Sequence, residues 1–241
     1  MTLLDEPTAE GLDERALAHP RHPGDAHPVG LAGVRELVDQ IVRKVEVTEP
    51  LTRVVSLAPS LTETSYDVGG GDALVGATQY ANHPEQAMQL PRVGSYVALD
   101  IEKIVSLEPQ LCLAIRDGNP KAAVDRLEAL GIPVYVFDPQ SLEAIVDTVE
   151  RLGSIYRKEA RATALADGYR QRLARVARRV AGVTNRPEAF FQIDAQPVIL
   201  AGYDTFLHQL LTRSGSINLA AGRSGYPRYT WEELLVLKPE V

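Results

Sequence analysis

The stretch SIYRKEARATALADGYRQRLARVARRVAG, residues 154–182, predicts one long helix. Its apolar residues recur at steps of three and four, which places them along a single face. Ser154 can cap the start of this helix, and arginines gather at its end just before Gly182. At about 1.5 Å per residue the helix would be roughly 40 Å long, which exceeds the width of a small lobe. We therefore interpret it as a helix that connects two lobes rather than as an ordinary surface helix.

Before this helix, short apolar runs alternate with amphipathic segments. A hairpin is expected in VDQIVRKVEV, residues 38–47, and Ser60 or Thr62 can cap the helix that follows the first buried strand. The later strands are expected at residues 53–60, 73–78, 111–115 and 133–138, and the helices at 61–69, 101–107, 121–131 and 141–153. This alternation predicts an α/β lobe with a mainly parallel sheet.

After the long helix the order of elements starts again. A strand is expected at residues 188–194, and helices are expected at 206–215 and 231–237. A constant offset of 130 residues pairs Tyr96 with Tyr226, Glu102 with Glu232, Leu107 with Leu237 and Pro109 with Pro239. We interpret the two halves as lobes of one design with mainly parallel sheets. Residue 241 corresponds to the start of the strand LCLAI in the first lobe, so the second lobe is expected to be incomplete.

Four segments follow from these patterns. Residues 1–34 are punctuated by proline and glycine and are expected to form a flexible leader. Residues 35–153 form the first lobe, residues 154–182 the connecting helix, and residues 183–241 the second lobe.

Composition excludes several classes of function. The chain of 241 residues is 45% hydrophobic, which is enough to bury a core. Its net charge of −7, with Lys and Arg scattered along the chain, argues against a nucleic-acid partner. Cys112 is the single cysteine and lies in the apolar run LCLAI, where we expect a buried strand residue. No phosphate-binding loop or nucleophile–base pair stands out, so we expect neither catalysis nor a bound metal or cofactor.

The paired loops predict a binding cleft. Ligands of open parallel sheets bind beyond the carboxyl ends of the strands, where VGSYVALD (93–100) and SGYPRYT (224–230) are expected to lie. A cleft walled by tyrosines suits a large, flat, partly apolar ligand, although both rings could merely cover the sheet edge. Glu102 and Glu232 each begin the next helix, where a carboxylate meets the helix dipole favourably. As a matched pair they could also form a two-point docking surface.

Three stretches together resemble a known family. RVVSLAPSLTE (53–63), GATQYANHPEQAMQLPRVGSYVALDIEKIVSLEPQL (76–111) and RDGNPKAAVDRLEALGIPVYVFD (116–138) are similar to the cobalamin-binding periplasmic proteins of ABC importers. The wider group, two α/β lobes joined by one helix, also binds haem and ferric siderophores, and the resemblance covers residues 38–241. It implies docking of Glu102 and Glu232 onto permease arginines. The expected ligand-binding residues are Ser60, Tyr80, Tyr96, Arg116, Asp117, Asn119 and Tyr226.

The sequence departs from the family pattern at two positions and at its start. Val42 stands where the hairpin DQxGRxVxV usually has glycine, which disfavours that turn, and Ile115 stands where an aromatic residue can occur. The first residues are acidic and do not read as an export signal.

We expect a monomeric, non-enzymatic receptor for cobalamin or a related corrinoid, located in the periplasm or otherwise outside the cytoplasm by resemblance. A haem or ferric-siderophore receptor is the alternative within this class. A cytosolic sensor or enzyme with the same cleft is the alternative in another class, and an authentic start without an export signal would favour it.

Overall fold

The main sheet of the first lobe contains four parallel strands. The structure is a computed structural model that describes residues 33–239 of the chain. The strand order is β4-β3-β5-β6, and every neighbouring pair is parallel, as the sequence predicts. The strands are β3 (Val54–Ser56), β4 (Leu74–Ala77), β5 (Leu111–Ile115) and β6 (Val134–Phe137).

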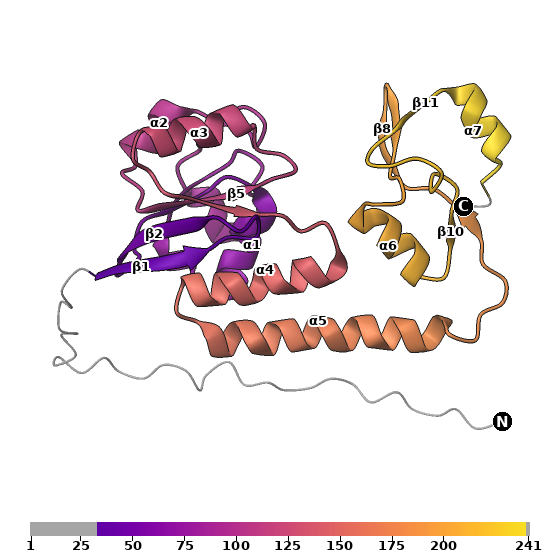
Figure 1. Cartoon of the computed structure of the whole chain (residues 1–241), viewed down its shortest axis with the longest axis horizontal. Coiled ribbons are helices and arrows are strands. Elements are labelled where there is room, and N and C mark those ends of the chain that lie inside the picture. Colours follow the sequence, from indigo (N-terminus) through magenta and orange to yellow (C-terminus); the bar gives the residue numbers. More distant parts are fainter. Residues whose placement is uncertain (1–32, 240–241) are drawn as a thin grey trace. The chain divides into compact units, whose positions relative to one another are not determined.

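Helices cover both faces of this sheet, which explains why its strands are apolar on both sides. One face packs against α1 (Pro59–Asp67) and α4 (Leu142–Ile155), and the other packs against α2 (Ile101–Ser106) and α3 (Lys121–Ala129), as Figure 1 shows. Two short 3₁₀ turns, η1 (Gly71–Ala73) and η2 (Glu85–Gln89), lie in the connections.

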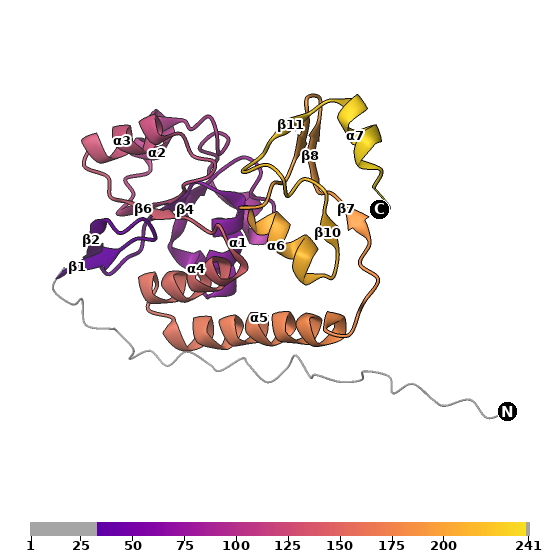
Figure 2. The same ribbon diagram turned by 45° about the vertical axis from the view of Figure 1, so that its right-hand side comes forward.

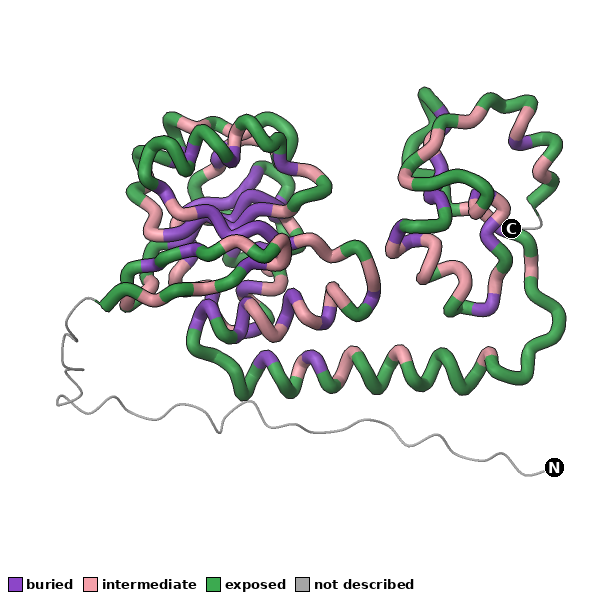
Figure 3. Tube along the Cα trace, viewed as in Figure 1, coloured by how far each residue is buried: buried purple, intermediate pink, exposed green. Residues whose placement is uncertain are grey.

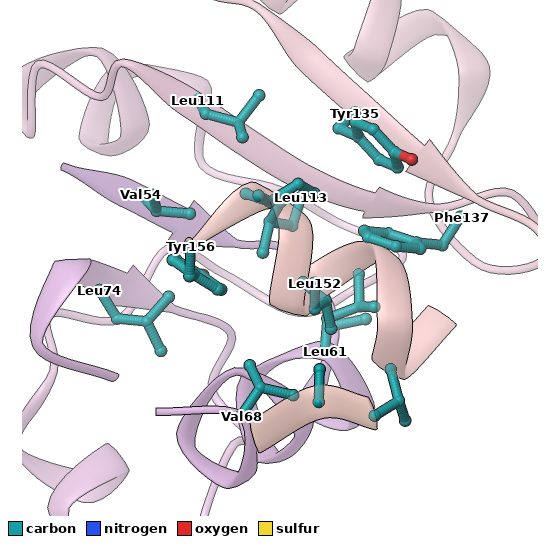
Figure 4. Close-up of a cluster of buried hydrophobic side chains, with 14 of the residues drawn as sticks. Val54, Leu61, Val68, Leu74, Leu111, Leu113, Tyr135, Phe137, Leu152 and Tyr156 are labelled. Atoms are coloured by element: carbon teal, nitrogen blue, oxygen red, sulfur yellow. The ribbon is translucent and has the colours of Figure 1, made fainter. Parts of the chain in front are cut away.

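The larger core lies between the sheet and the α1–α4 layer. Figure 4 shows Val54, Leu111 and Leu113 of the strands facing Leu61 of α1 and Leu152 of α4. On the opposite face, Cys112 is fully buried in β5, as expected, and burial raises the pKa of its thiol to about 12. The tube in Figure 3 shows that burial is concentrated in these strands.

The first helix begins earlier than the sequence suggested. Ala58 is the N-cap residue of α1 and Pro59 is its first residue, so neither Ser60 nor Thr62 caps it. Proline suits this position because its fixed φ is helical and its missing N–H would have had no intrahelical partner. The Thr62 hydroxyl is instead buried, 2.9 Å from Ser56 Oγ.

A β-hairpin precedes the sheet. β1 (Gly33–Val38) pairs antiparallel with β2 (Lys44–Glu49), which confirms the predicted hairpin and places its first two residues inside the predicted leader 1–34. The rest of that leader and residues 240–241 lie outside the part that the structure describes.

The hairpin turn protects the free edge of the main sheet. β6 is one of the two edge strands, and the backbone N–H of Gln40 donates to Val136 O at 3.1 Å. The buried Asp39 carboxylate accepts from Val136 N at 3.3 Å and forms an ion pair with Arg43 at 2.9 Å. These contacts occupy backbone groups that would otherwise be open to pairing with another chain.

The same turn holds a valine in a left-handed backbone conformation. Val42 has a φ of 65°, and it is 83% exposed. In this region the Cβ atom crowds the backbone and costs about 1–2 kcal/mol for a residue other than glycine. The strain expected at this position from the sequence is therefore present.

We expect Val42→Gly to stabilise the protein by about 0.5–1 kcal/mol, because relief of the left-handed strain exceeds the extra flexibility that glycine gives the unfolded chain. Urea denaturation followed by circular dichroism measures this change. Val42→Ala is the matched control, since it removes the branched side chain but keeps the Cβ atom, and it should gain little. Lower stability of Val42→Gly would show that contacts of the valine side chain outweigh the strain.

The connecting helix is shorter at its start than predicted. α5 spans Glu159–Val180, whereas Ser154 belongs to α4, whose N-cap is Ser141. Ser154 therefore caps no helix, and the prediction of one helix from residue 154 is wrong. The chain turns at Arg157, which has a φ of 57°, and then starts α5.

α4 and α5 run side by side, as Figures 1 and 2 show. Their contact depends on small residues: a Cβ atom on Gly153 would lie 2.1 Å from the Cβ of Ala162, and Ala162 and Ala166 are both buried. The second half of α5 is largely exposed. No helix within residues 33–239 combines the length and the apolar character needed to cross a membrane.

The second lobe contains two small sheets, and the larger one is antiparallel, unlike the mainly parallel sheet expected there. β7 (Glu188–Ala189) pairs parallel with β10 (Ile217–Asn218), whereas β8 (Gln192–Ala195), β9 (Val198–Leu200) and β11 (Arg228–Tyr229) form an antiparallel sheet. The expected strand over 188–194 is therefore two strands in different sheets, because Ala189 is buried beside β10 while the exposed β8 forms a hairpin with β9. The helices α6 (Phe206–Arg213) and α7 (Trp231–Leu237) agree with the sequence.

Candidate functional site

Asn119 connects three segments at the carboxyl end of the main sheet. Its side-chain amide donates to Leu57 O at 2.9 Å and to Tyr96 O at 2.7 Å, and its Oδ1 accepts from Ile115 N at 2.8 Å. The residue is only 6% exposed. Both amide hydrogens are thus committed to the protein, which favours a role for Asn119 in positioning the loops rather than in contacting a ligand.

Tyr96 is held in place at two points. Asn119 binds its carbonyl oxygen, and its ring lies against Gly118, where an added Cβ atom would be 2.9 Å from the ring. The residue as a whole is nevertheless 41% exposed. Gly118 was not among the expected site residues, although a glycine inside the RDGN turn is a usable signal for such a close approach. Tyr96 therefore presents an apolar face to solvent from a fixed position.

Other predicted residues surround this edge. Ser60 is exposed in the first turn of α1, directly after β3, and Tyr80 is exposed in the turn after β4. Arg116 forms an ion pair with Asp138 at 2.7 Å. The first-lobe residues of the predicted set therefore all follow the carboxyl ends of β3, β4 and β5, except Tyr96, which the Asn119 hydrogen bond brings there.

Tyr226 lies beside Asp117. Burial raises the pKa of the Tyr226 hydroxyl, and the negative charges of Asp117, which is its hydrogen-bond partner, and of Asp204 raise it further. Because the phenol stays protonated at neutral pH, it can donate to the carboxylate. The RDGN turn and the loop 224–230 are thus in contact, whereas the sequence symmetry had paired the loop 224–230 with the loop 93–100.

A recess of about 730 Å³ adjoins this edge. Arg116, Asn119 and Asp138 line it together with α3 and the hairpin turn over residues 40–43. The hairpin residues were not among the expected site residues, and only the DQxGRxVxV pattern pointed to that turn. Among the described residues no group of three or more His, Cys, Asp or Glu is arranged to hold a metal ion.

The structure supports the offset of 130 residues at α2 and α7. Asp100 caps α2 by accepting from Lys103 N at 2.9 Å, and at the equivalent position Thr230 caps α7 by accepting from Glu233 N at 3.2 Å. The equivalent core positions, Ile104 and Leu234, are both buried.

Glu102 and Glu232 occupy the first turns of these two helices and are exposed. Within residues 33–239, no hydrogen bond or ion pair engages either carboxylate. Both are therefore available to a partner.

Comparison with known proteins places the chain in a family. Residues 54–241 match the family model described as periplasmic binding protein. The chain belongs to this family. A periplasmic binding protein is a receptor for transport and not an enzyme, so the alternative of an enzyme is not retained.

Several family members resemble the chain over most of its length. It is 35% identical over 190 residues to a vitamin B12-binding protein of Photorhabdus laumondii, a match that covers 78% of this chain and 69% of that protein. A vitamin B12-binding protein of Yersinia pseudotuberculosis is 32% identical over 216 residues, with 89% and 75% covered.

Solved structures of the family share the fold. The periplasmic vitamin B12 binding protein of Vibrio cholerae superimposes with a TM-score of 0.73 at 32% identity, covering 80% of this chain and 75% of that one. A periplasmic haem binding protein from Pseudomonas aeruginosa gives 0.72 at 31% identity, covering 78% and 69%. These matches confirm the predicted α/β architecture with its parallel sheet.

Proposed function

We propose that this protein captures cobalamin or a related corrinoid outside the cytoplasm and delivers it to the permease of an ABC importer. The observation that carries the proposal is the 32–35% identity to vitamin B12-binding proteins over most of the chain. The site is consistent with it, because the exposed tyrosines Tyr80, Tyr96 and Tyr226 offer flat apolar faces suited to a macrocycle.

Haem is the second candidate ligand. The haem binding protein from Pseudomonas aeruginosa is nearly as similar as the vitamin B12 receptors, with 31% identity. Tyrosine is a known axial ligand of haem iron, and three tyrosines belong to the candidate site. A corrinoid needs no such bond to the protein. The tyrosine hydroxyl groups would therefore act as metal ligands only if the ligand is haem.

A titration separates these ligands. The purified protein is mixed in turn with cyanocobalamin, haemin and a ferric hydroxamate siderophore, and quenching of tryptophan and tyrosine fluorescence is followed. Saturable quenching by cyanocobalamin with a 1:1 end point supports the proposal. Saturable binding of haemin alone, with a shift of its Soret band, would replace the corrinoid by haem. Failure to bind any of the three would contradict the proposed class of ligand.

Docking is proposed to use the two exposed glutamates. Glu102→Ala and Glu232→Ala should leave ligand affinity unchanged and reduce association with vesicles that contain the importer's permease, and the double variant should lose more than either single one. Added salt should weaken association as well, because exposed charges act through screened attraction. Glu63→Ala, an exposed glutamate of α1, is the control. Loss of ligand affinity in the soluble variants would instead place these carboxylates in the ligand site.

A further inference from the structure

Two loops at the carboxyl edge of the main sheet are joined to each other. The turn over residues 78–81 follows β4 and carries Tyr80, and the segment 91–94 runs beside it. Gln79 N donates to Gly94 O at 2.8 Å. The same segment leads directly into the loop with the second tyrosine of this edge. The two loops that carry predicted ligand contacts in the first lobe are therefore connected through their backbones.

The side chain of Arg92 reaches from this segment across the turn. Its Nη1 donates to Thr78 O at 2.9 Å and to Ala81 O at 3.0 Å. Thr78 and Ala81 are the first and last residues of the turn, and both are fully buried. Because a guanidinium Nη1 carries two hydrogens, one atom can bind both carbonyl oxygens. Arg92 thereby holds both ends of the turn that presents Tyr80 to solvent.

The turn has few other restraints of its own. Ala81 N donates to Thr78 O at 3.1 Å, which closes the turn. The buried Thr78 hydroxyl has no hydrogen-bond partner within residues 33–239, so it does not brace the backbone as threonine hydroxyls in turns can. Within the same residues, Ala81 O accepts a hydrogen bond from Arg92 alone. Loss of Arg92 would leave a buried carbonyl without a partner, which disfavours the present form of the turn.

Tyr80 depends on this turn for its position. The residue is 59% exposed, so packing of its ring contributes little to holding it. Its carbonyl oxygen accepts from Asn82 N at 3.0 Å, a bond within the turn region itself. A side chain that must be ordered when a ligand binds lowers the affinity, whereas a side chain on a fixed turn does not.

We propose that Arg92 is a positioning residue that presents Tyr80 to the ligand, as Asn119 presents Tyr96. This inference rests on the proposed capture of a ligand by the tyrosine site, and Arg92 acts through the turn rather than by contact with the ligand. Arginine suits this role because its planar guanidinium donates in fixed directions and its charge strengthens both hydrogen bonds. A lysine ammonium lacks the fixed planar geometry.

A double-mutant cycle tests the coupling between Arg92 and Tyr80. Arg92→Met removes the donors and keeps an apolar stem, and it should weaken cyanocobalamin binding about threefold or more in isothermal titration calorimetry. In a Tyr80→Ala background the same substitution should have almost no further effect, because no ring is left to position. In a Tyr226→Ala background it should keep its full effect. Arg92→Lys retains the charge and one donor, so it should recover part of the affinity and serves as the second variant if Arg92→Met does not fold.

Fluorine NMR reports the position of Tyr80 without any ligand. Protein that contains 3-fluorotyrosine is compared with and without Arg92→Met, and the Tyr80 and Tyr203 signals are assigned by their absence from the Tyr80→Phe and Tyr203→Phe variants. The Tyr80 signal should move and sharpen, whereas the signal of Tyr203, an exposed residue of the second lobe, should not change. Arg126→Met replaces an exposed arginine of α3 and is the matched control, which should alter neither affinity nor spectrum.

Two results would overturn the inference. An equal loss of affinity with and without Tyr80 would show that Arg92 contacts the ligand itself. An unchanged Tyr80 signal in Arg92→Met would show that the turn keeps its form without the arginine. The fluorine spectrum requires no ligand, so failure to bind cyanocobalamin, which would contradict the proposed function, is distinguished from failure of the positioning role.

Discussion

Replacing Tyr96 and Tyr226 together with alanine is expected to weaken ligand binding at least tenfold. Aromatic anchors in a water-poor site often contribute about 2 kcal/mol or more each when truncated, and about 1.4 kcal/mol corresponds to a factor of ten. Tyr96 is already fixed by Gly118 and Asn119, so little ordering is required of its ring on binding. Isothermal titration calorimetry with cyanocobalamin measures the change.

The control for this experiment is Trp231→Ala, which removes an exposed aromatic residue from outside the predicted ligand set. It should leave affinity unaltered. Raising the salt concentration should also have little effect, because the proposed contacts are apolar rather than charged. If the double tyrosine variant binds as tightly as the unaltered protein, these rings do not form the ligand site.

Asn119→Ala is expected to lower the free energy of unfolding by about 2–4 kcal/mol, because it removes three hydrogen bonds and leaves buried backbone groups without partners. It should also weaken ligand binding, since the Tyr96 loop loses its attachment to the sheet. Urea denaturation and ligand titration measure the two effects.

Asn185→Ala, at an exposed position after α5, is the matched control and should change neither quantity. Reduced affinity with unchanged stability would show that Asn119 contacts the ligand directly. Rescue of affinity at low temperature, where the loop is better ordered, would support a positioning role.

Individual helices and strands in both lobes could be predicted well where their signals are local. β5 coincides with the apolar run LCLAI, and α7 coincides with WEELLVL, since a capping residue precedes that helix and an apolar period fills it. The start of α5 could not be predicted, because the break at Arg157 carries neither glycine nor proline. The chain turns there so that α4 and α5 can pack through Gly153, a tertiary contact without a local signal.

The candidate site was only partly predictable, because contacts between distant segments leave no local signal in the sequence. Its residue types were evident, as aromatic and polar residues after apolar strands, but their interactions were not. Asn119 was expected to bind the ligand, and only the folded chain shows that its side chain instead joins Leu57, Ile115 and Tyr96. The proximity of Asp117 and Tyr226 likewise depends on segments more than one hundred residues apart.

The burial of Cys112 in the middle of β5 makes this thiol a chemical reporter of global unfolding. Disulfide exchange and alkylation both require an accessible thiolate, and a pKa of about 12 in a fully buried strand provides neither. The native receptor is thereby protected from covalent dimerisation under oxidising conditions. Only chains in which the main sheet has opened would react with a maleimide. The rate of labelling would therefore report how often the main sheet opens.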